Sequence, residues 1–134
     1  MGKQWNYKGI IPALALPLKA DYSIDEQDLR RLASWLATHK GISALMTNGH
    51  TGDVFSLTLK GRVEVTRIVA DELKGKLPVI SAVTAEGIHE GIEQALMHKE
   101  AGAARLDIMP PHHWLRLGTR PEHVVDHFAA IGEA

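Results

Sequence analysis

The chain has 134 residues, of which 45% are hydrophobic and 23% charged, and its formal net charge is −1. This length suits one domain with its own core, and the small net charge gives no electrostatic reason to bind nucleic acid or an anionic membrane surface. The absence of cysteine excludes disulfides and thiolate chemistry. No apolar run approaches the roughly 20 residues of a membrane span, and the first residues lack the apolar segment of a signal peptide. We therefore expect a cytoplasmic protein with no nucleic-acid or membrane partner.

Four strand-like runs are expected along the chain. They cover residues 9–16, 42–47, 77–83 and 104–109. Each run is continuously apolar rather than alternating, which is typical of parallel strands that are covered on both faces.

A helical pattern follows each of these runs. The first helix starts near a capping-box pattern at Ser23–Glu26, and Thr58 is the expected cap of the second. The third is expected to stop at Gly102, and Pro121 opens the fourth. The expected buried side of the fourth helix consists of Val124, Val125, Phe128 and Ile131.

Strict alternation of strands and helices predicts right-handed βαβ units and a parallel sheet. A unit of roughly 30 residues fits either a (β/α)8 barrel or a doubly wound sheet. A complete barrel needs about 250 residues, whereas this chain holds four units. The predicted fold class is therefore α/β, with residues 1–134 forming a single partial domain, the first four βα units of a TIM barrel.

The loop at residues 48–53 stands where the second expected strand ends. Its glycines, Gly49 and Gly52, can adopt positive φ, turn the chain tightly and direct successive N–H groups into one concavity. Such a loop suits the carboxylate or phosphate of a small ligand. Alternatively, the two glycines only make a tight turn between a strand and a helix.

Several motifs resemble the dihydrodipicolinate synthase and N-acetylneuraminate lyase family. They are, in chain order, 9–13 with 17–18, 23–25, 48–53 with 55–58 and Arg62, 77–80, and 101–104 with 110–113. Members of this family are TIM barrels that form a Schiff base between a lysine and pyruvate or another 2-keto acid. The resemblance implies a lyase, either an aldolase or a dehydratase, that uses no cofactor and forms a homo-oligomer, a dimer or a tetramer.

The resemblance also implies roles for individual residues. The family's loop holds the keto-acid carboxylate, which implies Gly49, His50, Thr51 and Gly52 as substrate-binding residues. His50 and His113 stand where the synthases have a threonine and a tyrosine of a hydroxyl proton relay, and they are the candidate catalytic residues. An imidazole can act as acid or base but cannot copy a hydroxyl relay unchanged. We therefore expect a different aldolase or dehydratase, acting on a 2-keto sugar acid or a similar substrate.

The catalytic lysine of the family has no counterpart here, since the resemblance places it on a sixth strand. The lysines considered as candidates fall in loops or on polar helix faces; they are Lys19, Lys40, Lys60, Lys74, Lys76 and Lys99. A nucleophilic lysine needs a desolvated pocket, so the chain alone is predicted to be inactive. The alternative is a noncatalytic half-barrel that assembles with another copy or another chain, because four strands leave two open edges.

The eight histidines invite a metal interpretation. His123 and His127 are four residues apart on the fourth helix and could face one ion. No carboxylate–histidine set has recognisable ligand spacing, so no metal site is predicted. Positions on the surface or at the barrel rim are expected for the histidines.

Overall fold

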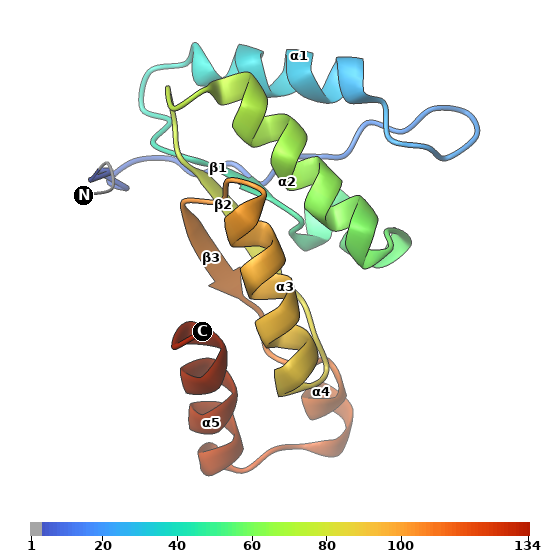
Figure 1. The fold of residues 1–134 in the computed structure, drawn as a ribbon, viewed down its shortest axis with the longest axis vertical. Helices are drawn as coiled ribbons and strands as arrows, with labels where there is room; N and C mark the ends of the chain where they lie inside the picture. The colour runs from blue at the N-terminus through green and yellow to red at the C-terminus, as the bar shows by residue number, and fades with distance from the viewer. Residues whose placement is uncertain (1–3) are drawn as a thin grey trace.

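The structure is a computed structural model that describes residues 4–134. Three parallel strands lie in the order β1-β2-β3, and helices follow them along the chain (Figure 1). The elements are α1 (Glu26–Ala37), β1 (Leu45–Thr47), η1 (His50–Gly52), η2 (Val54–Ser56), α2 (Leu59–Leu73), β2 (Val79–Val83), α3 (Ile88–Glu100), β3 (Arg105–Ile108), α4 (His113–Leu117) and α5 (Pro121–Gly132). The predicted alternation is confirmed for α1, β1, α2, β2, α3, β3 and α5, whereas η1, η2 and α4 were not predicted.

The prediction of a regular strand at residues 9–16 is wrong. Two isolated parallel bridges join this segment to the next, Ile10 to Ile42 and Ala13 to Met46. The segment therefore advances three residues while its partner advances four, which breaks the register. Pro12 has no N–H to donate, although its carbonyl accepts from Met46 N at 3.0 Å. On the two sides of this break the side chains differ in burial: Ile10 is 64% exposed, whereas Leu14 is buried.

The helix ends follow the predicted chemistry with one exception. Thr58 caps α2, since its side chain accepts a hydrogen bond from Gly61 N at 3.2 Å. Asp25 rather than Ser23 caps α1: its carboxylate accepts from Asp28 N at 3.0 Å. The Ser23 hydroxyl instead donates to Asp21. A side-chain oxygen thus satisfies one N–H of the first turn in both helices.

Two apolar clusters hold the elements together. The larger one lies where α1 and α2 pack on β1 and β2, and it includes the fully buried Leu29, Leu45 and Leu73. The smaller one joins β2, α3 and α5 through Val83, Ala95 and Ile131. The predicted buried side of α5 is confirmed for Ile131 but wrong for Val125, which is 66% exposed.

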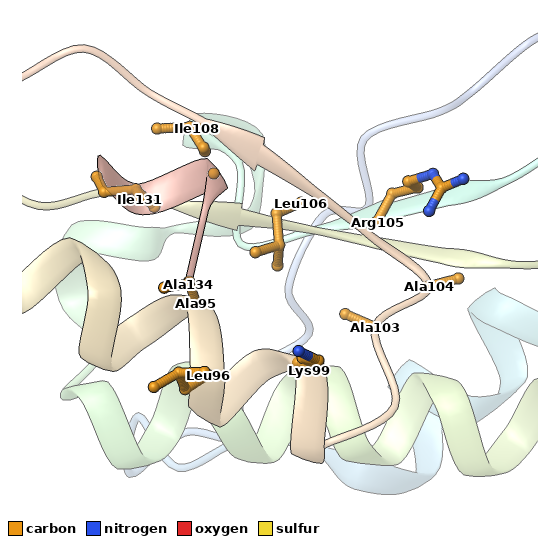
Figure 2. Close-up of a pocket in the computed structure, with 11 residues that line it drawn as sticks. Ala95, Leu96, Lys99, Ala103, Ala104, Arg105, Leu106, Ile108, Ile131 and Ala134 are labelled. Atoms are coloured by element: carbon orange, nitrogen blue, oxygen red, sulfur yellow. The ribbon is translucent and has the colours of Figure 1, made fainter. Parts of the chain in front are cut away.

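One edge of the sheet is open. Within residues 4–134, β3 pairs only with β2. A groove of about 410 Å³ runs beside β3, between α3 and the last turn of α5 (Figure 2). Leu106 and Ile108 from β3 line it together with Leu96 from α3. The structure therefore presents an apolar groove along a strand that is paired on one edge only.

Candidate functional site

The predicted binding loop follows β1 directly, at the carboxyl end of the strand. Its left-handed residues are Asn48 (φ 60°) and Asp53 (φ 54°), so the expectation that Gly49 and Gly52 supply positive φ is wrong. Gly52 is needed for another reason, since a Cβ added there would lie 3.0 Å from the Leu14 carbonyl oxygen. The loop therefore approaches the backbone of the first segment closely at this glycine.

Two amides of the loop, those of His50 and Thr51, take no part in the hydrogen bonds of their own turn. Gly52 N donates to the Gly49 carbonyl at 2.9 Å, and Asp53 N donates to the His50 carbonyl at 3.2 Å. The amides of His50 and Thr51 begin the 3-10 turn, so no earlier carbonyl of the turn can accept from them. Both residues are exposed. Adjacent N–H groups of this kind can bind an anion without a cationic side chain.

A buried polar network lies beneath this loop. Asn48 is 1% exposed, and its Nδ2 lies 3.0 Å from the Arg62 carbonyl, 2.9 Å from Thr66 Oγ1 and 3.0 Å from Ser81 Oγ. Thr66 Oγ1 also lies 3.2 Å from Nδ1 of His98. Sequence reasoning missed this network, although Ser81 and Thr66 are polar positions within apolar patterns.

His98 is completely buried, so its predicted position on the surface or rim is wrong. Burial, followed by the nearby positive charge of Arg62, lowers the pKa of His98 to about 4. The imidazole is therefore neutral near pH 7.

Arg62 joins the loop to the end of the neighbouring strand. Its Nε donates to the Val54 carbonyl at 3.0 Å, and its Nη1 donates to the Thr84 carbonyl at 3.2 Å. Burial lowers the pKa of this guanidinium, an effect that Glu90 opposes. The Arg62 side chain thus links η2 to Thr84, the residue after β2, by hydrogen bonds.

The two candidate catalytic histidines have different neighbours. The His50 ring lies 5.5 Å from the ring of His112 and 5.4 Å from that of Phe55. His113 instead bonds to Glu86 through Nδ1 and lies 6.2 Å from Trp114. The structure therefore brings His50 next to His112, a residue to which sequence reasoning gave no role.

Glu86 holds the segment that carries His112 and His113. Its carboxylate accepts from His112 N at 2.9 Å and from His113 N at 3.2 Å, and it bonds to both imidazoles. Burial acts to raise the pKa of Glu86, but the hydrogen bonds from His113 and His112 outweigh it and lower this pKa to about 2. The carboxylate thereby fixes the start of α4, a helix that the sequence did not predict.

Protonation of Glu86 is expected to weaken the fold. Its pKa falls from 4.5 to about 2 in the folded chain, so its contribution is present above about pH 4.5 and is lost as the pH falls toward 2. Because the side chain is 52% exposed, we expect Glu86→Gln to cost only about 0.5–1 kcal/mol at pH 7. Urea unfolding between pH 3 and 7 measures this loss, with Glu93→Gln, at an exposed carboxylate of α3, as the control. Equal pH slopes for wild type and Glu86→Gln would contradict the prediction.

A second cavity, of about 220 Å³, lies between α4 and α5. His127 lines it and is 3% exposed, with no hydrogen-bond partner for its buried Nε2 among the described residues. The expected surface or rim position is therefore wrong for His127 too, because the Trp114 ring covers it at 5.4 Å. Residues 4–134 hold no group of three or more His, Asp or Glu side chains that could bind a metal ion.

The lysines of the described chain are all exposed. None of them sits in a desolvated pocket of the kind that activates a Schiff-base nucleophile. In the same part of the chain, no helix combines the length and apolarity needed to cross a membrane.

Comparisons with known proteins show the family of the chain. The model of the "Dihydrodipicolinate synthetase family" matches residues 6–134. A probable 5-dehydro-4-deoxyglucarate dehydratase from Bradyrhizobium sp. (strain ORS 278) is 36% identical over 104 residues, which cover 78% of this chain and 32% of that protein. A 4-hydroxy-tetrahydrodipicolinate synthase from Nitrosococcus oceani is 34% identical over 130 residues, or 96% of this chain and 42% of that protein. The chain thus spans less than half the length of these relatives.

Solved structures share the fold. A 4-hydroxy-tetrahydrodipicolinate synthase from Methylacidiphilum fumariolicum SolV matches with a TM-score of 0.88 at 20% identity, over 96% of this chain and 41% of that chain. An N-acetylneuraminate lyase from Fusobacterium nucleatum, complexed with pyruvate, matches with a TM-score of 0.83 at 24% identity, over 95% of this chain and 42% of that one. The predicted fold class, α/β and the N-terminal half of a TIM barrel, is confirmed.

Proposed function

Because the chain belongs to the dihydrodipicolinate synthetase family, we propose that it is the carboxylate-binding half of a Schiff-base-forming lyase. The substrate of the complete enzyme is pyruvate or a 2-keto sugar acid. The observation that carries this proposal is the pair of adjacent amides, His50 and Thr51, that open a turn at the carboxyl end of β1. The Thr51 hydroxyl adds a third donor, and Gly49 and Gly52 complete the binding loop.

The names of the relatives support the reaction class. They include a dehydratase, a synthase and a lyase, and one solved neighbour holds pyruvate. What these chemistries share is a keto acid, whose carboxylate needs fixed hydrogen-bond donors. In this proposal His50 and His113 take part in proton transfer, while the lysine comes from the remaining part of the barrel. The complete protein is proposed to be a cytoplasmic homo-oligomer, as the family resemblance implies.

A second candidate function is a noncatalytic half-barrel module, with residues 1–134 as one partial domain that assembles with another copy or chain. The open edge of β3 and the apolar groove beside it favour this candidate. The two candidates differ in whether the loop binds a keto acid.

Pyruvate is expected to bind the loop and to bind Thr51→Val more weakly. Loss of one hydrogen bond to a charged group should raise the Kd about tenfold, since such bonds contribute about 1.5–3 kcal/mol and this site is open to water. NMR titration of ¹⁵N-labelled protein measures the Kd from the amide shifts of His50 and Thr51. Thr119→Val, at an exposed threonine before α5, is the matched control.

Two results would count against the proposal. An unchanged Kd for Thr51→Val would remove the Thr51 hydroxyl from the site. The absence of any saturable shift in the wild type would reject the carboxylate site itself. Acetone, which has the ketone but no carboxylate, should leave both amides unshifted.

A further inference from the structure

The backbone at Asn48 is held in a conformation that few residues adopt. A left-handed φ costs an L-residue roughly 1–2 kcal/mol, and asparagine tolerates it better than most. Asn48 adopts φ 60° while its side chain is buried and directed at acceptors on α2 and β2. Gly49, His50 and Thr51 follow directly, so the direction of the loop amides depends on how firmly this one residue is held.

Thr66 is the centre of the network that holds Asn48. It is completely buried, and its hydroxyl lies 2.9 Å from Asn48 Nδ2, 3.0 Å from Ser81 Oγ and 3.2 Å from His98 Nδ1. A hydroxyl can donate one hydrogen bond and accept two. Because Asn48 Nδ2 can only donate, Thr66 Oγ1 accepts from it, and the contacts of this oxygen with Ser81 and His98 constrain how the hydroxyl is oriented.

His98 brings a second helix, α3, into this arrangement. It lies on α3, fifty positions after Asn48 in the sequence, and it is completely buried. Neutral imidazole can either donate to or accept from Thr66 through Nδ1, whereas a cation could only donate. The bond from His98 therefore limits the orientations that the Thr66 hydroxyl can take, and through it the position of the Asn48 amide.

We propose that His98 is a positioning residue for the loop: acting through Thr66, it fixes the left-handed backbone of Asn48 and thereby the direction of the His50 and Thr51 amides. This inference deepens the proposed function and rests on it for the identity of the ligand. The hydrogen bonds that carry the proposal lie outside the loop itself, on α2, β2 and α3.

Hydrogen exchange of the Gly52 amide tests the proposal without any ligand. This amide bonds to the Gly49 carbonyl inside the loop and is buried. His98→Leu keeps the bulk of the side chain but removes its hydrogen bond to Thr66. The exchange rate of the Gly52 amide should rise in this variant by a factor at least ten times larger than the rise for the β2 amides. His98→Gln, which restores a polar group near Thr66, should recover most of the protection.

Two further variants separate positioning from general stability. Val69→Ala opens space in the buried core of α2 without touching the network, so it should accelerate exchange at β2 and Gly52 alike. Asn48→Gly accepts a positive φ without strain but lacks the amide, so it should loosen Gly52 as His98→Leu does and shows the effect of losing the Asn48 bonds alone. His98→Met, which also lacks the ring nitrogen, replaces His98→Leu in the test if that variant fails to fold. Equal acceleration at Gly52 and β2 in the network variants would overturn the proposal.

The pyruvate titration of the wild type tests the proposed function separately from the role of His98. Failure of the wild type to bind pyruvate rejects the proposed function. The loop-specific exchange decides the role of His98 whether or not pyruvate binds.

Discussion

Reduction with borohydride in the presence of pyruvate is expected to leave the mass of this chain unchanged. A Schiff base needs an uncharged lysine amine, which proteins obtain by desolvating the side chain or by placing it near another cation. The lysines of residues 4–134 are all exposed. Intact-mass measurement after reduction therefore should show no added three-carbon unit on the chain.

A full-length member of the family, treated in parallel, is the positive control for this trapping. Lactate replaces pyruvate in the negative control, since it has the carboxylate but no carbonyl to condense with an amine. A stoichiometric adduct on any lysine of this chain would contradict the prediction and would show that the half-barrel carries its own nucleophile.

Substitution of Gly9 by alanine is expected to detach the first segment from the sheet. Gly9 has φ +153°, and a Cβ there would lie 2.5 Å from the Gly41 carbonyl oxygen, which is backbone and cannot rotate away. That same carbonyl accepts the hydrogen bond of Ile10 N at 2.8 Å. We expect a loss of about 2–4 kcal/mol in the free energy of unfolding, because backbone strain and a steric clash each contribute about 1–3 kcal/mol.

Gly41→Ala is the matched control for this prediction. Gly41 has φ +92°, but no atom lies within 4 Å of the added Cβ. Only the backbone strain remains there, so the expected loss is about 1 kcal/mol. Urea unfolding followed by circular dichroism measures both variants, and equal losses would show that the contact with the Gly41 carbonyl has no part in the effect.

The order of elements could be predicted because local chemistry decides it. Continuous apolar runs became β1, β2 and β3, and Thr58 capped its helix as its side-chain oxygen allows. The position of the loop after β1 could be predicted for a similar reason, since a polar glycine-containing segment directly follows an apolar strand. These features depend on residues that are neighbours in the sequence.

What could not be predicted depends on contacts between distant residues. The bonds from Glu86 to the amides of His112 and His113 order the start of α4 across more than twenty-five positions. His98 looked like a surface residue on a helix with mixed composition, yet it is buried against Thr66. Helix periodicity reports which face is apolar, and it gives no sign that a polar side chain on that face has found a partner.

The first segment shows a third kind of limit. Its apolar run is as long as those of the regular strands, but the missing N–H of Pro12 and the one-residue mismatch between its two bridges prevent a continuous ladder. The prediction of a parallel arrangement for this segment agrees with its two bridges, but the prediction of a regular strand is wrong.

The open edge of β3 has a consequence for how the stability of this chain must be measured. The open edge of a strand beside an apolar groove gains hydrogen bonds and buried area from any strand that joins it. Whatever joins the folded chain there, and not the unfolded one, shifts the folding equilibrium by mass action. If copies pair at this edge, the melting temperature of the isolated chain should rise with the protein concentration. A melting temperature measured at one concentration would then apply to that concentration only.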